Sequence, residues 1–294
     1  PGLSVTILNG DGYIEYSKGF GYADVEKKIN INPKNSIFRI GSFSKTLAGT
    51  ALMKMYEEKK IEIDSPVGFY IKNLPADKKK ITLKQIAGHL SGIRHYGDGD
   101  DMNLNLNYEN TSEALNIFIN DSLLFDPGTK YSYSTHAWTL LSLAMEKAYG
   151  ENFIQLMKNE ILNPLHLDKT FAEEIDLVLN DKVAFYEKNE SGDIVLCPDV
   201  NNSWKWAGGG YVSTTQDMAK FTWQVLYTDF LLPETVKEMT KSQKLPDDKK
   251  TNYGIGWRIR NDDNNNRYLG HGGSSIGGKT FVFSSKDKFV VSVM

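Results

Sequence analysis

The segment Phe38-Arg39-Ile40-Gly41-Ser42-Phe43-Ser44-Lys45 decides how this chain should be interpreted. Residues 37–40 have the character of a short buried strand, and apolar residues then recur with helical spacing. A helix that begins near Ser42 would place the Ser42 hydroxyl and the Lys45 amine one turn apart on one face. The free N–H groups of its first turn would face anything attached to that hydroxyl. A nucleophile, a base and an oxyanion donor can therefore come from four consecutive residues.

A Ser-x-x-Lys pattern also arises by chance. Ser285-Lys286-Asp287-Lys288 fits it too, but this copy lies between two strand-like runs with no helix to organise it, which is typical of a solvated turn. For Ser42 the alternative is a plain helix N-cap with Lys45 as a surface lysine. The motif alone leaves both interpretations open.

Composition limits the possible classes of function. The chain has 294 residues, of which 40% are hydrophobic, and this is enough for one large domain or two intimately packed lobes. Its 34 basic and 37 acidic residues nearly balance, with no basic stripe, so nucleic acid is not an expected partner. The single Cys197 excludes an internal disulfide framework.

No apolar run reaches the length of a membrane span. The chain starts and stops inside strand-like runs, so the lack of a targeting segment carries little weight. Any membrane association is expected to depend on a segment outside this chain.

Strand-like runs stand at both ends of the chain, and helical patterns lie between them. The N-terminal runs are 3–8 and 13–20, joined by the turn Asn9-Gly10-Asp11-Gly12. The C-terminal runs are 253–260, 279–284 and 289–294. Helices are expected after the Thr82-Leu83-Lys84-Gln85 capping box and over 111–119, 135–148, 152–162, 214–227 and 233–240.

This order predicts an α+β fold with an antiparallel sheet assembled from both termini, and not an alternating βαβ arrangement. The sheet lobe should comprise about 1–59 and 207–294. A mainly helical lobe, about 60–206, should be inserted between them.

Three further segments bear on the interpretation of Ser42. Residues 126–135 contain a Pro-Gly turn followed by Tyr133, just before a strong helical pattern. Residues 202–214 contain three consecutive glycines, which allow close approach of a ligand or else form a hinge or tight turn. Gly270-His271-Gly272-Gly273-Ser274 lies at the mouth of the C-terminal strands.

Together these four segments resemble the penicillin-recognising serine hydrolases, the class C β-lactamase-like family that includes peptidases of the D-alanyl-D-alanine carboxypeptidase B type. The motifs occur in the family's order and cover nearly the whole chain. Residues 89–96 and 204–210 look most like the mitochondrial β-lactamase-like serine protease and its bacterial relatives. The resemblance implies a β-lactamase/transpeptidase-like fold over residues 1–294, a single catalytic domain whose site lies between the two lobes.

The resemblance implies acyl transfer at Ser42. Ser42 would attack a carbonyl, and Lys45 would take its proton, with a pKa lowered by desolvation and a second cation. Tyr133 would relay a proton to the leaving group, and the backbone amides of Ser42 and Ser274 would form the oxyanion hole. No metal or organic cofactor is implied. The implied substrate-binding residues are Thr135, His271, Gly272, Gly273 and Trp206.

Two positions depart from the family pattern. Thr135 stands where many members carry Asn, and His271 stands where β-lactamases and cell-wall peptidases usually have Lys. A neutral imidazole is a weaker partner than an ammonium for a substrate carboxylate.

We therefore expect a hydrolase that acts on an ester, an amide or a short peptide through an acyl-Ser42 intermediate. Its natural substrate is not expected to be penicillin. The alternative is a sensor or assembly protein that acylates without turnover. The expected partners are a small-molecule or peptide substrate and further copies of this chain in a homo-oligomer.

Two other kinds of motif are only partly matched in this chain. Gly273-Ser274-Ser275-Ile276-Gly277 matches a Gly-x-Ser-x-Gly nucleophile elbow, but that fold needs a following helix and a later histidine. No histidine follows His271. The chain has no metal-binding spacing among its five histidines, which are His89, His95, His136, His166 and His271.

Several residues near these motifs have open roles. His89, Arg94 and His95 are expected to hold the loop after a helix end, with substrate contact as the alternative. Trp204 and Trp206 fit either a cleft wall or the core. Loops 96–110 and 186–206 are expected to shape the pocket.

Overall fold

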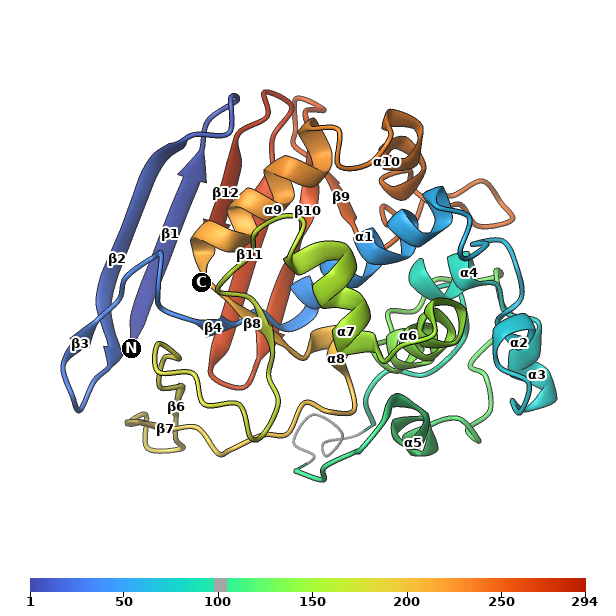
Figure 1. The fold of residues 1–294 in the computed structure, drawn as a ribbon, viewed down its shortest axis with the longest axis horizontal. Helices are drawn as coiled ribbons and strands as arrows, with labels where there is room; N and C mark the ends of the chain where they lie inside the picture. Colours follow the sequence, from blue (N-terminus) through green and yellow to red (C-terminus); the bar gives the residue numbers. More distant parts are fainter. Residues whose placement is uncertain (98–104) are drawn as a thin grey trace.

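The computed structural model describes residues 1–97 and 105–294, which fold around a seven-stranded antiparallel sheet. The sheet order is β3-β2-β1-β12-β11-β10-β9, so that β1 pairs with β12 and the two ends of the chain lie side by side (Figure 1). The predicted α+β fold with a sheet built from both termini is confirmed. Its strands are β1 Gly2–Leu8, β2 Ile14–Asp24, β3 Ile29–Asn30, β9 Arg258–Asn261, β10 Arg267–Ser275, β11 Gly278–Ser284 and β12 Val290–Val293.

Most of the helices gather beside the sheet, while α9 crosses one of its faces (Figure 1). The α-helices are α1 Ser44–Glu57, α2 Val67–Tyr70, α3 Ala76–Lys79, α4 Leu83–Ala87, α5 Thr111–Ala114, α6 His136–Tyr149, α7 Phe153–Met157, α8 Trp206–Gly209, α9 Thr215–Tyr227 and α10 Pro233–Met239. Two 3-10 turns, η1 Gly41–Phe43 and η3 Leu115–Ile117, and a π-helical turn, η4 Lys158–Leu162, extend this set.

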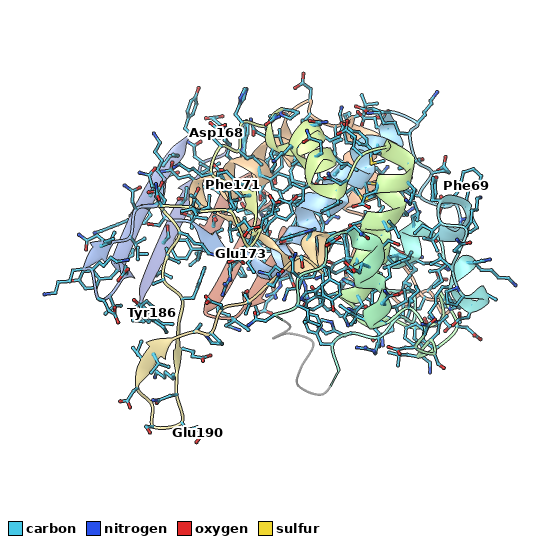
Figure 2. All side chains as sticks on the ribbon, turned by 60° about the horizontal axis from the view of Figure 1, so that its bottom comes forward. Phe69, Asp168, Phe171, Glu173, Tyr186 and Glu190 are labelled. Carbon is cyan, nitrogen blue, oxygen red and sulfur yellow. The ribbon has the colours of Figure 1, made fainter. Side chains whose placement is uncertain are left out.

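Two small sheets complete the fold. The first has the order β4-β8-β5 and joins Phe38–Arg39 to Tyr211–Ser213 and Phe171–Ala172. It ties the strand before Ser42 to the segment after the glycine run. The second is the hairpin of β6, Tyr186–Lys188, with β7, Ile194–Leu196, which projects from the body with Glu190 near its tip (Figure 2).

Local chemistry explains several helix ends. Thr82 accepts a hydrogen bond from the Gln85 amide and the Gln85 side chain accepts one from the Thr82 amide, so the predicted capping box forms at α4. Gly150 ends α6 with φ of 90°, a left-handed conformation that glycine adopts without steric cost. The predicted helix over 111–119 begins at Thr111 as α5, and the Asn110 side chain caps it by accepting from the Glu113 amide.

The helix after Ser42 begins later than predicted. Residues 41–43 form the 3-10 turn η1, and α1 starts at Ser44. Its residues from Ser44 to Met53 are all buried, so α1 is a central core helix and not an amphipathic surface helix. Lys45 is therefore held by a buried core helix, and Ser42 lies in the turn directly before that helix.

The C-terminal strands differ from the prediction in two places. Residues 253–257 do not form a strand, because Gly256 takes a left-handed φ of 75° and packs against the Lys45 carbonyl. The glycine-rich segment around His271 is part of the nine-residue strand β10, which the sequence pattern does not predict.

The two rejected motifs occupy turns. The Gly-x-Ser-x-Gly match covers the end of β10 and the turn that leads to β11, and no helix follows it. The second Ser-x-x-Lys lies between β11 and β12, with Lys288 exposed at φ of 64°.

Residues 98–104 of the predicted pocket loop 96–110 lie outside the described residues. Within 1–97 and 105–294, no helix is both long and apolar enough to cross a membrane.

Candidate active site

Ser42 stands at the turn between β4 and α1. Gly41 has φ of 50°, which allows the chain to change direction directly after the strand. The Ser44 hydroxyl donates to the Gly41 carbonyl at 2.8 Å and accepts from the Tyr211 amide at 3.2 Å. The turn that presents Ser42 is therefore fixed to β8 by hydrogen bonds.

Lys45 reaches back from the first turn of α1 to the serine. Its Nζ lies 3.3 Å from Ser42 Oγ. It also donates to the Gly208 carbonyl at 2.5 Å and to Thr135 Oγ1 at 3.0 Å. The lysine is fully buried, and so the three contacts define its position. The alternative of a surface lysine is wrong.

The surroundings of Lys45 favour the neutral amine. Burial lowers its pKa well below the ordinary value, and the cations of Lys205 and Arg258 lower it further. A neutral amine has two N–H groups and one lone pair. With Gly208 and Thr135 as the two acceptors, the lone pair is directed at the Ser42 hydroxyl.

Tyr133 lies over the amine of Lys45. The Lys45 Nζ is 4.8 Å from the centroid of the Tyr133 ring, and the guanidinium carbon of Arg258 is 5.3 Å from it. The Tyr133 hydroxyl is buried and has no hydrogen bond of good geometry within the described part of the chain. Burial raises its pKa, against smaller opposing effects of Ser42 and Arg258, so the phenol keeps its proton at neutral pH.

Glycines bring the expected oxyanion donors into one place. Gly41 packs against the backbone of Ser274, and Gly273 packs against the Ile40 carbonyl and the Ser42 amide nitrogen. Side chains at these positions would force the serine turn away from β10. Ser42 and Ser274 both line the cavity described below.

His271 is buried and uses both of its ring nitrogens. Nδ1 lies 2.5 Å from the Gly272 carbonyl, which can only accept, so Nδ1 carries the proton. Nε2 accepts from the Tyr253 hydroxyl at 2.9 Å and lies 3.4 Å from Arg258 Nε. Burial and the charge of Arg258 lower the pKa of His271 well below the ordinary value. The ring is therefore neutral at pH 7.

A cavity of about 490 Å³ opens at Ser42. Six of the residues predicted from the sequence line it, namely Ser42, Tyr133, His271, Gly272, Gly273 and Ser274. Thr135 and Trp206 do not line it. Thr135 contacts Lys45 beneath the cavity, whereas Trp206 borders two neighbouring hollows with Ile154 and Glu174.

The other lining residues are His95, Tyr96, Arg258, Arg260, Lys279 and Thr280. For His95, substrate contact was the alternative interpretation, and Tyr96 begins the loop 96–110 that was expected to shape the pocket. The remaining four were not predicted as site residues. Three of them are cationic, and no Asp or Glu of the described chain lines the cavity. The alternation Arg258-Ile259-Arg260 in a strand-like run was the available signal for two of them, since residues two apart share one face.

A buried ionic cluster supports the turn from behind. Glu173, near the centre of the molecule in Figure 2, accepts from Arg39 Nε at 2.9 Å, from Lys182 at 2.6 Å and from Asn202 at 2.5 Å. Arg39 also donates to the Ile276 carbonyl at 3.1 Å. Because Arg39 lies in β4 and residue 276 joins β10 to β11, the cluster links the two segments that carry Ser42 and Ser274.

No group of three or more His, Cys, Asp or Glu side chains in residues 1–97 and 105–294 is arranged to hold a metal ion. The cavity offers a serine, a phenol and backbone amides, and the buried Lys45 amine lies 3.3 Å from the serine hydroxyl. These groups can perform nucleophilic substitution at a carbonyl.

Several known proteins are similar to this chain in sequence. The Beta-lactamase family profile matches residues 1–294. The serine beta-lactamase-like protein LACTB, mitochondrial, of Homo sapiens is 29% identical over 345 residues, which cover 88% of this chain and 62% of LACTB. The chain thus spans less than two thirds of that relative's length.

Solved structures share the fold. The octameric penicillin-binding protein homologue from Pyrococcus abyssi superposes with a TM-score of 0.85 at 25% identity, covering 100% of this chain and 69% of that one. A D-stereospecific amidohydrolase from Streptomyces sp. superposes with a TM-score of 0.81 at 20% identity, covering 100% of this chain and 88% of that one. The second likeness concerns the fold alone.

Proposed function

Because the chain belongs to the Beta-lactamase family, we propose that it is a serine hydrolase that forms an acyl-enzyme on Ser42. The observation that carries the proposal is the setting of Lys45. Its amine is buried, has acceptors for two N–H groups, and lies 3.3 Å from the Ser42 hydroxyl. Burial and the nearby cations lower its pKa, which favours an amine that can accept the serine proton and make the hydroxyl a nucleophile.

The roles of the remaining groups follow from their protonation states. Ser42 Oγ attacks the carbonyl carbon as its proton passes to Lys45, and the oxygen that gains negative charge lies at the amides of Ser42 and Ser274. Tyr133, whose pKa is raised, gives its phenolic proton to the departing oxygen or nitrogen. Protons pass back along the same groups when water releases the acyl chain from Ser42.

The cationic wall supports an anionic substrate. Arg258, Arg260 and Lys279 line the cavity, and none of them forms an ion pair with an acidic residue of the described chain. Since His271 is neutral, Arg258 is the group best placed to bind a carboxylate beside the scissile bond. We therefore propose esters, amides or short peptides with a free carboxylate as substrates.

The test is intact-protein mass spectrometry after treatment with a fluorophosphonate. Wild-type protein should gain one phosphonyl group, and Ser42→Ala should gain none. Ser285→Ala is the matched control, because it removes the serine of the second Ser-x-x-Lys, and it should be labelled like the wild type. Failure to label wild type, or an adduct on Ser42→Ala, would contradict the proposal.

A second measurement separates an enzyme from a sensor. Wild type and Ser42→Ala are assayed with p-nitrophenyl esters, nitrocefin, amino acid p-nitroanilides and peptides. Turnover that depends on Ser42 is the expected result. A stable acyl-protein with no turnover of any of these compounds would instead favour the sensor.

We also propose that the chain self-associates. The support is the homologue from Pyrococcus abyssi, which is octameric. Light scattering of the purified protein across a range of concentrations tests this, and a constant mass of 33.1 kDa would contradict it.

A further inference from the structure

His89 holds the chain on both sides of Tyr133. The Ser132 amide donates to the His89 carbonyl at 3.0 Å, and the Ser134 amide donates to His89 Nδ1 at 3.1 Å. One residue that follows α4 thus fixes the backbone immediately before and immediately after Tyr133. This arrangement limits how the phenol can move along the cavity wall.

The imidazole of His89 also packs on the ring of Tyr133. The centroids of these two rings are 4.2 Å apart, and the centroid of the Tyr253 ring lies 4.5 Å from that of the imidazole. Tyr253 in turn donates to His271. The His89 ring therefore contacts both the Tyr133 ring, which carries the proposed proton donor, and the Tyr253 ring, which is hydrogen-bonded to His271.

The hydrogen bonds define the tautomer of His89. Nδ1 accepts an amide proton, so the proton of the neutral ring is on Nε2, which has no hydrogen-bond partner within the described residues. The side chain is fully buried, and a charged ring would lose the Ser134 contact. Burial, followed by the charges of Lys45 and neighbouring groups, lowers its pKa well below the ordinary value.

The backbone of His89 is strained in a way that serves this geometry. Its φ is 63°, a left-handed value that is uncommon for residues other than glycine and that a structure keeps only where its surroundings impose it. Here that conformation directs both the carbonyl and the ring of one residue at the segment 132–134.

We propose that His89 is a positioning residue that acts through Tyr133, holding the phenol in line with the leaving group. The proposal rests on the proposed acyl-Ser42 function. It predicts a defect that depends on the leaving group. A p-nitrophenolate departs without protonation, whereas the nitrogen of an anilide must receive a proton, which is the step assigned to Tyr133.

The experiment compares His89→Leu and His89→Asn with wild type on a matched p-nitrophenyl ester and p-nitroanilide. Leu removes the acceptor and the aromatic ring, so kcat for the anilide should fall roughly 100-fold, with about a threefold change for the ester and for KM. Asn tolerates a positive φ and offers an oxygen in place of Nδ1, so it should recover part of the anilide activity.

Three controls keep the result interpretable. His166→Leu replaces an exposed histidine that also has a left-handed φ, of 50°, and it should leave the anilide-to-ester ratio unchanged. Fluorophosphonate labelling, whose fluoride leaves unaided, should stay near wild type in the His89 variants. In a Tyr133→Phe background, the His89 substitutions should change the anilide rate less than twofold.

The outcomes are distinguishable. If His89 variants lower ester and anilide rates equally, or lower the anilide rate just as much when Tyr133 is Phe, the positioning role is wrong. If wild type is not labelled by the fluorophosphonate, the proposed function fails first. If His89→Leu does not fold, His89→Asn alone decides between these results.

Discussion

Gly41 packs directly on the backbone of Ser274, and a Cβ atom on Gly41 would lie 2.6 Å from the Ser274 carbonyl oxygen and 2.9 Å from its amide nitrogen. Real Cβ atoms essentially never approach other atoms this closely. The relation is reciprocal, since Gly273 lies against the backbone of Ile40 and Ser42. The distance between the two amides expected to bind an oxyanion is thus set by contacts in which a glycine packs directly on backbone atoms of the other segment.

Gly41→Ala should therefore abolish most of the acylation. The added methyl group must push the serine turn away from Ser274, and losing one oxyanion donor typically costs about 100-fold or more in rate. The measurement is the second-order rate of fluorophosphonate labelling. Gly192→Ala is the matched control, because Gly192 also has a left-handed φ, of 86°, but has open space around it. A labelling rate that is equally slow in both variants would argue against the contact with Ser274.

The sequence predicted those parts of the site that depend on local chemistry. The Thr82–Gln85 capping box is written in four adjacent residues, and it occurs as predicted. The order of strands and helices was also sufficient for the α+β class. Periodicity did not reveal β10, because Gly270, Gly272 and Gly273 provide no apolar alternation.

Contacts between distant segments could not be predicted in the same way. Arg258 reaches the cavity because it is paired with Gly270, and this register is set by the packing of the whole sheet. The isolation of Trp206 from the cavity likewise depends on where α8 packs against α6. The role of Thr135 as a partner of Lys45 needed the conformation of the chain before α6.

Lys205→Met should move the pH dependence of acylation. Lys205 is 8% exposed, with its Nζ 4.6 Å from the centroid of the Trp204 ring, and burial lowers its pKa to about 8. Its charge lowers the pKa of Lys45, so its removal should raise that pKa. Because the neutral amine is the active form, the rising limb of the kcat/KM profile should shift to higher pH.

The control for this shift is Lys182→Met. Lys182 is another cationic residue, which contacts Glu173 at 2.6 Å, but its charge is not among those that lower the pKa of Lys45. Its profile should keep the wild-type limb. A limb displaced equally in both variants, or displaced to lower pH by Lys205→Met, would contradict the assignment of Lys45 as the neutral base.

Arg258→Gln should remove the preference for an anionic substrate. A hydrogen bond to a charged partner contributes roughly 1.5–3 kcal/mol, so kcat/KM for a substrate with a free carboxylate should fall roughly 10- to 100-fold. The methyl ester of that carboxylate is the matched chemical control. Because the Arg258 charge also lowers the pKa of Lys45, both compounds are compared on the plateau above the rising limb of the pH profile, where the rate for the methyl ester should change little. Equal losses for both compounds would show that Arg258 acts on the fold or on His271 and not on the substrate charge.

Glu173→Gln should destabilise the protein strongly. Glu173 is 5% exposed and faces Arg39 and Lys182, so its neutralisation leaves buried cationic charge without its partner, at a cost of about 3–5 kcal/mol. Urea unfolding followed by circular dichroism gives the difference. Asp181→Asn breaks the pair with Lys169, in which both side chains are well exposed, and should cost less than about 1 kcal/mol. Similar losses in the two variants would mean that the buried cluster is not an anchor.

Mild acid should destabilise the fold through its buried histidines. His89 and His271 have pKa values well below 6.5 in the folded protein, whereas in the unfolded chain they bind protons as the pH falls through about 6.5. The unfolded state then carries more protons, so the free energy of unfolding must decrease as the pH falls below that value. Each histidine adds to the pH dependence of the free energy of unfolding a slope that approaches about 1.4 kcal/mol per pH unit.

Urea titrations between pH 7 and pH 5 should show a smaller slope of the free energy of unfolding against pH for His89→Asn than for wild type. Leu90→Ala, which truncates a buried neighbour without removing a titrating group, should lower stability at every pH and keep the wild-type slope. An unchanged slope in His89→Asn would mean that His89 is protonated in the folded protein, which its hydrogen bond from the Ser134 amide does not allow.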